Sequence, residues 1–150
     1  TQLDADGGGY IRSIVGNTKG RHRGSLWRCT DGSDWSRILP RFFRFAPSNP
    51  KEMYCLIGPC LSKKHLEVQD DVINQVKKMN FDTSPFYQKT DETHYLLDNK
   101  GLNKQQLLNL GVLEENIQVS SYCTNENNDL FFSHRVNHDG QRNVTIIKRK

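Results

Sequence analysis

The feature that most constrains the fold is the apolar run from Met53 to Ile57, which the turn residues Gly58 and Pro59 end abruptly. A short apolar run with such a boundary is typical of a buried strand. The segment before it, 19–50, keeps neither a strand nor a helix period, because Gly and Pro repeatedly interrupt it. We therefore expect a single domain, with an orderly core over 51–150 and an atypical Gly/Arg/Trp-rich segment over 1–50.

Three segments carry helical patterns. Asp70 and Asp71 supply N-capping carboxylates ahead of an apolar stripe that runs to Met79. Asp98 or Asn99 opens a second helix through Leu110, and Gly111 stands at its C′ position. The third is the segment 10–18, where Ile11, Ile14 and Val15 at i, i+3 and i+4 predict one or two helical turns after three glycines.

Strands are predicted where β-branched or aromatic residues run between Asn and Gly clusters. These segments are His94–Leu97, Ile117–Tyr122, Leu130–His134 and Asn143–Lys148, and the polar segment Phe81–Asp91 is expected to be a connector. Strands and helices follow one another without a repeated strand–helix–strand rhythm. The fold class is therefore predicted to be α+β, with mixed sheets packed against helices.

The four cysteines, at 29, 55, 60 and 123, form neither a CxxC pair nor a dense, regular framework. We interpret them as reduced thiols, with a set of disulfides as the alternative. No apolar run approaches the roughly 20 residues that cross a bilayer, and the segment 1–10 lacks the basic and apolar regions of a signal peptide. These observations predict a cytoplasmic protein that has no membrane partner.

The net charge of +4 is concentrated in the first third of the chain. Residues 1–50 hold eight Lys and Arg against four Asp and Glu, whereas residues 51–150 hold thirteen of each. The basic part also contains both tryptophans and three phenylalanines, a mixture found on nucleic-acid-binding surfaces if it folds into one. A solvated basic segment remains the alternative, and we do not expect a nucleic-acid partner.

The side chains able to bind a soft metal or to act as nucleophile and base are Cys60, His65, Cys123, His134 and His138. Cys123, His134 and His138 have a spacing compatible with zinc, although no closely spaced cysteine pair accompanies them. On a strand, Ser133 and Arg135 would face opposite His134. The planar guanidinium of Arg135 is suited to a phosphate or carboxylate, with a surface ion pair as the alternative.

Five ordered motifs resemble the laccase-domain family, also called polyphenol-oxidase-like or multicopper-oxidase laccase-domain proteins. The resemblance begins at Met53 and is carried by IGPC, SKKHLEV, LDNKGLNKQQLLNLGV, IQVSSYCT and DLFFSHR. It implies that residues 1–150 form a single, partial α+β domain of the laccase type, with the family-like core over 51–150. It also implies a metal-dependent purine nucleoside phosphorylase that binds a purine nucleoside and phosphate, with accompanying adenosine deaminase and methylthioadenosine phosphorylase activities.

The resemblance further implies a zinc ion, with copper as the alternative, held by a His, a Cys and a second His ahead of the IGPC motif. The second His belongs to a His-Ala-Gly-Trp-Arg-Gly signature, and Asp4 stands at its position here. A single carboxylate is not a metal site. We therefore expect that this chain alone binds little or no metal and has impaired catalysis.

The substrate-pocket candidates carried over from the family are Cys60, Cys123, Ser133, His134 and Arg135, and Arg135 is expected to bind the anion. Two other functions stay open. One is a non-catalytic module that binds through the basic segment 19–50. A frameshift and a divergent insertion would explain the unusual composition of this segment equally well. The other is a copper-dependent phenol oxidase, which would need several His-rich ligand sets.

Overall fold

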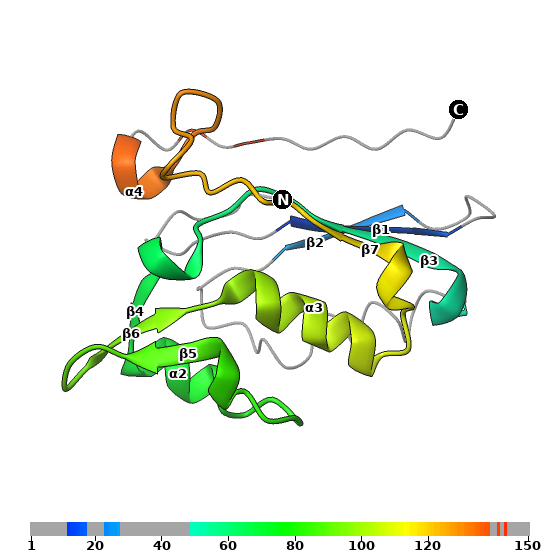
Figure 1. Cartoon of the computed structure of the whole chain (residues 1–150), viewed down its shortest axis with the longest axis horizontal. Helices are drawn as coiled ribbons and strands as arrows, with labels where there is room; N and C mark the ends of the chain where they lie inside the picture. Colours follow the sequence, from blue (N-terminus) through cyan, green and yellow to red (C-terminus); the bar gives the residue numbers. More distant parts are fainter. Residues whose placement is uncertain (1–11, 18–22, 28–48, 139–140, 142, 144–150) are drawn as a thin grey trace.

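The computed structural model describes residues 12–17, 23–27, 49–138, 141 and 143. Four strands form one sheet in the order β2-β1-β3-β7, and three form a second in the order β4-β6-β5 (Figure 1). The strands are β1 (Arg12–Asn17), β2 (Arg23–Trp27), β3 (Met53–Ile57), β4 (Glu67–Gln69), β5 (Tyr87–Lys89), β6 (His94–Leu97) and β7 (Ile117–Val119). The helices are α2 (Asp70–Val76), α3 (Asn99–Asn109) and α4 (His134–Asn137).

Four short 3-10 turns complete the described elements: η1 (Pro50–Glu52), η2 (Lys63–His65), η3 (Ser84–Phe86) and η4 (Glu114–Asn116). Helices and mixed sheets together make the fold α+β, as the sequence predicts. None of the described helices is long and apolar enough to span a membrane.

β3 confirms the strand predicted from the apolar run, and its neighbours explain its composition. It lies between β1, which pairs with it antiparallel, and β7, which pairs with it in parallel. Its alternate residues Met53, Cys55 and Ile57 are buried, whereas Tyr54 between them is 56% exposed. Period-2 burial on a central strand is the expected result of the pleat.

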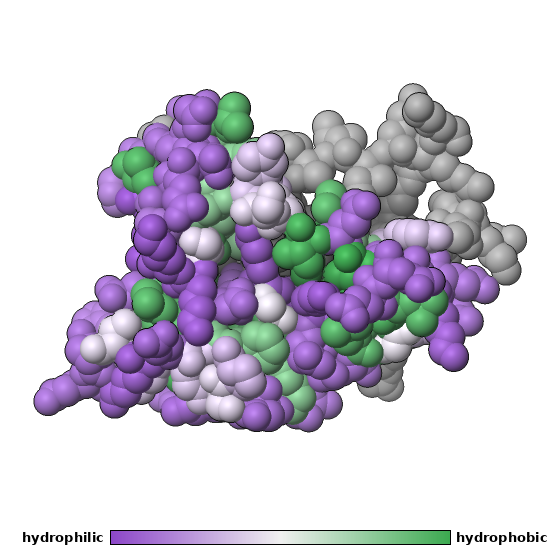
Figure 2. Space-filling view, in the orientation of Figure 1, coloured by the Kyte–Doolittle hydropathy of each residue, from purple (hydrophilic) through white to green (hydrophobic). Residues whose placement is uncertain are grey.

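Helix α3 connects two hydrophobic clusters. Leu107 packs with the buried face of β3, together with Val112 and Ile117, whereas Leu102 packs with Leu97 of β6 and the buried face of α2. In Figure 1, α3 accordingly lies between the four-stranded sheet and the smaller sheet with α2. The visible face of the molecule is mostly hydrophilic, with hydrophobic residues in separate patches (Figure 2).

The ends of α3 follow the predicted capping. The Asp98 side chain accepts from the Gly101 backbone N–H, and Leu110 is the C-cap. Gly111 has a φ of 92°, the left-handed conformation that favours glycine. In α2 the prediction was wrong in detail, because the N-cap is Gln69, whose side chain makes no capping bond. Asp70 and Asp71 instead stand in the first turn, where negative charge is favourable.

Two other predictions were wrong, and one segment for which the sequence predicts no element contains a strand. The expected helix over 10–18 contains strand β1, because this segment pairs with β2 on one side and β3 on the other. The segment 19–50, which keeps neither a helix nor a strand period, contributes β2. The connector Phe81–Asp91 includes β5, which pairs with the confirmed strand His94–Leu97.

The predicted strand Leu130–His134 is also wrong. Asn127 and Asn128 lie in a turn, and the chain then forms α4 from His134. The expectation that Ser133 and Arg135 face opposite His134 on a strand is therefore wrong as well. Of the predicted strand Ile117–Tyr122, residues 117–119 are confirmed as β7. The strand predicted for Asn143–Lys148 lies outside the described residues except for Asn143.

Candidate functional site

The candidate site lies where the neighbouring parallel strands β3 and β7 both end. Beyond the strands, the two chain segments continue side by side, since Ser120 N donates to Ile57 O at 2.8 Å and Thr124 N donates to Cys60 O at 3.1 Å. An isolated parallel bridge joins Cys60 to Cys123. The carboxyl ends of adjacent parallel strands are a common location for ligand sites, because the following loops converge there.

Cys123 is held in a polar setting although its residue is only 2% exposed. The backbone N–H of Ser62 donates to its Sγ at 3.3 Å. Burial alone would raise the pKa of this thiol, but contacts from Ser62 and the backbone N–H groups of Asn125 and Glu126 together lower it. Hydrogen bonds to sulfur favour the thiolate, the form that acts as nucleophile or metal ligand.

The other two described cysteines differ from Cys123. Cys60 is also buried, and its Sγ donates to Leu61 O at 3.2 Å. Cys55 lies in the core of the four-stranded sheet, where burial raises the pKa of its thiol to about 12. All three are free thiols, in agreement with the prediction of reduced cysteines, and Cys29 lies outside the described residues.

The side chains of His65 and Glu126 are hydrogen-bonded to each other beside Cys123. His65 is the last residue of η2, which the bond from its backbone N–H to Ser62 O closes. His65 Nε2 lies 2.9 Å from Glu126 Oε1, and Lys64 Nζ lies 3.7 Å from the same oxygen. The potential ligand atoms of His65, Cys123 and Glu126 all lie within 4.8 Å of one another.

Ser133, His134 and Arg135 lie on α4 and just before it. Ser133 N donates to Asn137 Oδ1 at 2.8 Å, which closes the short helix. The Ser133 hydroxyl and His134 Nδ1 are buried without a hydrogen-bond partner among the described residues. His138 ends the helix with a φ of 53°. These buried polar atoms mark α4 as a place where a ligand or solvent could supply the missing bonds.

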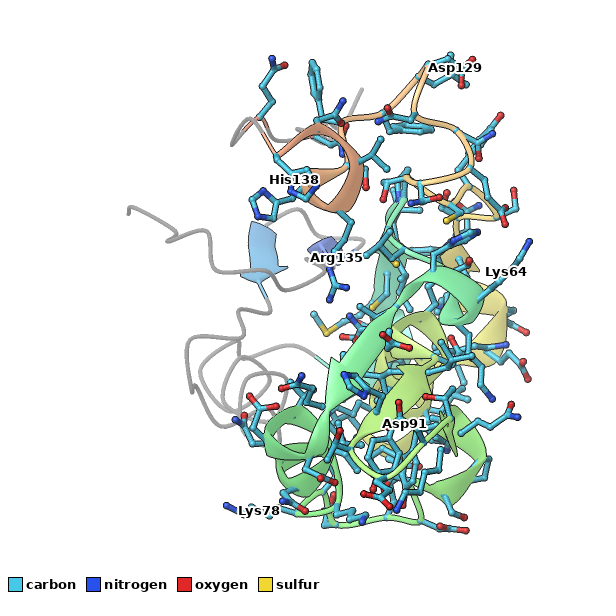
Figure 3. The ribbon with its side chains drawn as sticks, turned by 90° about the vertical axis from the view of Figure 1, so that its left-hand side faces the viewer. Lys64, Lys78, Asp91, Asp129, Arg135 and His138 are labelled. Carbon is cyan, nitrogen blue, oxygen red and sulfur yellow. The ribbon has the colours of Figure 1, made fainter. Side chains whose placement is uncertain are left out.

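Arg135 ties α4 to the segment that follows η2. Its Nη2 donates to the carbonyl oxygen of Glu67 on β4 at 2.9 Å. Figure 3 shows Arg135 beneath α4, whereas Lys64 extends outward on another side of the molecule. The contact fixes the direction of an exposed guanidinium that is able to bind two oxygens at once.

The structure thus brings together some of the sequence candidates. Cys60 and Cys123 are neighbours, and Arg135 contacts the segment that also carries His65. Among the described residues, the group able to hold a metal around Cys123 contains His65 and Glu126, not His134 and His138 as the spacing hypothesis had it. Asp4 lies outside the described residues.

Glu126 is the residue that the sequence reasoning missed. It follows Cys123 by three positions, and both lie in the irregular segment after β7. A cysteine and a carboxylate with two residues between them in a turn are a usable ligand spacing, so this signal was present in the sequence. The spacing alone does not predict a metal site, because nothing in the local sequence indicates that His65 lies beside Cys123 and Glu126.

Solved structures with the same fold cover most of the chain. The Bacillus licheniformis hypothetical protein YfiH matches with a TM-score of 0.75 and 25% identity, over 86% of this chain and 50% of that chain. YlmD from Geobacillus stearothermophilus matches with a TM-score of 0.73 and 26% identity, over 86% and 49%. The fold is therefore of the same class as these YfiH and YlmD proteins.

The chain belongs to the family described as multi-copper polyphenol oxidoreductase laccase, whose pattern matches residues 22–150. The match begins upstream of Met53, where the motifs that carry the resemblance in the sequence begin.

Purine nucleoside phosphorylase YlmD of Bacillus subtilis (strain 168) is 31% identical over 125 residues, 83% of this chain and 43% of that protein. A purine nucleoside phosphorylase of Staphylococcus epidermidis (strain ATCC 12228) is 32% identical over 126 residues, 83% and 46%. The chain spans less than half the length of these relatives.

Proposed function

We propose that this chain acts in the phosphorolysis of purine nucleosides. The observation that carries the proposal is its similarity, at 31% identity over 83% of the chain, to a Bacillus subtilis protein named as a purine nucleoside phosphorylase. The chain covers 43% of that relative, so the activity of the whole relative is transferred here as a hypothesis. Adenosine deamination and methylthioadenosine phosphorolysis belong to the same proposal, on the family resemblance.

The reaction assigns a clear task to a cationic side chain. An oxygen of phosphate forms a bond to C1′ of the ribose, the bond from C1′ to N9 of the base breaks, and the purine leaves with a proton while ribose 1-phosphate forms. Arg135 is our candidate for the phosphate site, because a guanidinium binds two phosphate oxygens in one plane. Its bond to Glu67 O supports the choice, since a group held in one direction loses less entropy on binding.

The remaining pocket candidates are Cys60, Cys123, Ser133 and His134. The buried Ser133 hydroxyl and His134 Nδ1 could bond to the ribose or the base. The family resemblance implies zinc, with copper as the alternative, and such an ion would polarise the leaving base or activate water. Because Asp4, at the position of a family ligand, is not among the described residues, we assign no step to that ion. The free thiols of the described cysteines support a cytoplasmic setting.

The test is an assay of phosphate-dependent hypoxanthine release from inosine on the purified full chain, together with saturation-transfer NMR for inosine binding and 31P NMR line broadening for phosphate binding. We expect binding of both ligands and a turnover below that of a full-length relative. Arg135→Ala should weaken phosphate binding about tenfold or more, with inosine binding unchanged, whereas Lys89→Ala, a surface control, should change neither. Absence of inosine binding and of hypoxanthine release would refute the proposal, and turnover equal to that of a relative would refute the impairment.

Copper-dependent phenol oxidation is the second candidate, because the family's own description names it. Such chemistry needs several copper-binding ligand sets. The described residues provide one group able to hold a metal. We therefore favour phosphorolysis. Oxygen uptake by the chain with a phenolic substrate and added Cu²⁺ would instead favour phenol oxidation.

A further inference from the structure

The irregular segments after β3 and β7 bring three different kinds of metal-ligating side chain to one point. His65 comes from η2, whereas Cys123 and Glu126 come from the segment that follows β7. We propose that His65, Cys123 and Glu126 form a site for zinc or a similar divalent ion. It is separate from the ligand set that the family resemblance places ahead of IGPC, and it does not rest on the proposed phosphorylase activity.

The donor set matches the preferences of zinc. Zinc accepts sulfur, imidazole nitrogen and carboxylate oxygen together, and three protein ligands leave the fourth tetrahedral position for water or a substrate atom. A thiolate, a carboxylate and a neutral imidazole carry two negative charges, which balance a divalent ion. Magnesium and calcium, which prefer all-oxygen sites, fit this set poorly.

The distances require a small adjustment of exposed side chains. Tetrahedral zinc places its nitrogen, oxygen and sulfur ligands about 3.3–3.6 Å apart. The ligand atoms here lie within 4.8 Å of one another, and the pair His65 Nε2 and Glu126 Oε1 lies at 2.9 Å. The His65 and Glu126 side chains are 25% and 48% exposed, so both have room to turn and an ion can reach them from solvent.

Cys123 is the fixed ligand of the three. The bridge to Cys60 and the bond from Ser62 N to its Sγ hold the sulfur in place. Outer contacts of this kind orient a ligand and raise its affinity for a metal. Binding would replace the thiol proton, which leaves to solvent, by the bond from sulfur to the ion.

Among the described residues, Lys64 is the lysine that forms an ion pair with one of these ligands. Its Nζ lies 3.7 Å from Glu126 Oε1, but its side chain is 77% exposed. It extends outward in Figure 3. An exposed ion pair of this kind contributes little, so a divalent ion can displace the ammonium at small cost.

The test is cobalt and zinc binding by the full chain. Cobalt should give a charge-transfer absorption from the Cys123 thiolate, together with the intense visible bands of tetrahedral coordination, and zinc should displace it. His65→Asn and Glu126→Gln should each weaken zinc binding at least about tenfold, since even outer-shell partners are worth 10–100-fold. Cys123→Ser should abolish the charge-transfer band.

Matched controls separate this site from others. His94→Asn and Glu92→Gln remove a surface histidine and a surface carboxylate elsewhere and should leave the spectrum and the affinity unchanged. Cys123 is buried, so its variant could fail to fold. In that case the variants at the partly exposed His65 and Glu126 decide whether the ion binds at this site. No metal binding by the full chain would overturn the proposal. Binding that survives both exposed variants would also overturn it, and loss on Asp4→Asn would move the ion to Asp4.

Discussion

Lys100 Nζ donates to the carbonyl oxygen of Ser120 at 2.7 Å, and so connects the first turn of α3 to the segment that follows β7. The same ammonium donates to Tyr122 O at 2.7 Å. The two carbonyls belong to residues three positions and one position before Cys123 in the chain. One side chain on α3 therefore fixes the backbone that presents the candidate ligand Cys123.

Replacing Lys100 by Met should lower both stability and metal affinity. Bonds to charged donors contribute more than neutral ones, but this site is partly exposed, so we expect the free energy of unfolding to fall by about 1–2 kcal/mol. Zinc affinity should fall several-fold, because the segment carrying Cys123 and Glu126 loses its support. Denaturant unfolding and a zinc titration measure the two effects.

Lys104→Met is the matched control on the same helix. Lys104 Nζ pairs with Glu114 Oε1 at 2.7 Å, but the two side chains are 36% and 72% exposed. Exposed pairs contribute about 0–1 kcal/mol. An equal loss of zinc affinity in both variants would contradict a specific role for Lys100.

The two leucines of α3 test whether the described core unfolds as one unit. Leu107 is 0% exposed in one hydrophobic cluster and Leu102 is 1% exposed in the other. Leu107→Ala and Leu102→Ala should each cost about 2–5 kcal/mol. Because one helix carries both side chains, each variant should still unfold in a single transition, measured by circular dichroism and fluorescence together.

Leu113→Ala supplies the comparison. Because Leu113 is 39% exposed, this substitution should lower the free energy of unfolding much less than the two core substitutions. Two separate transitions in either core variant would show that the two clusters fold as independent units. That result would contradict the single domain predicted from the sequence.

Local signals in the sequence were enough for the elements whose ends are chemically marked. The helix from Asn99 was predictable because Asp98 caps it and Gly111 takes the left-handed conformation after it. The strand β3 was predictable because Gly58 and Pro59 end an apolar run. In these places, capping and turn chemistry agree with the packing.

Elements set by distant partners were not predictable from local pattern. The apolar spacing of Ile14 and Val15 fits a helix, yet the pairing of β1 with both β2 and β3 makes it a strand. The candidate metal site had the same difficulty. His65 and Glu126 are 61 positions apart, and only the parallel pairing of β3 with β7 brings them together.

The pair His94 and Asp91 predicts a pH-dependent contribution on the surface. The hydrogen bond that the His94 ring donates to the Asp91 carboxylate is the largest influence on the pKa of His94. Together with the smaller effects of the Asp91, Glu67 and Asp70 charges, it outweighs burial and raises that pKa above its ordinary value of 6.5. Bonds from Thr93 and His94 lower the pKa of Asp91 below 3.8. NMR titration of the His94 ring should show the raised pKa, and Asp91→Asn should move it back toward 6.5.

The signs of these shifts define the pH window. A raised histidine pKa contributes stability that is full below 6.5 and is lost as pH rises through the higher folded value. A lowered carboxyl pKa contributes stability above 3.8 that is lost as pH falls through the lower folded value. The contribution is therefore largest in weakly acidic solution. A His94 pKa unchanged by Asp91→Asn would disprove the assignment.

Gly101 should resist the usual stabilising change of a helical glycine to alanine. A Cβ at this position would lie 2.5 Å from Asp98 Oδ2 and 2.9 Å from Phe86 Cδ1. Alanine favours a helix by about 0.5–1 kcal/mol over glycine, but the Asp98 carboxylate would have to leave the Gly101 N–H that it caps, and a cap contributes about 1 kcal/mol. With the contact to Phe86 added, Gly101→Ala should lower the free energy of unfolding by about 1 kcal/mol.

A double-mutant cycle identifies the cause of that loss. In an Asp98→Ala background the cap and the clash with Oδ2 are both absent, so Gly101→Ala should cost clearly less than it does in the unaltered chain. The remaining cost then reports the contact with Phe86, and Phe86→Leu should reduce it further by clearing the ring edge. Equal effects of Gly101→Ala with and without Asp98 would show that the cap is not displaced, and the closeness of Gly101 to the carboxylate would then have no energetic consequence.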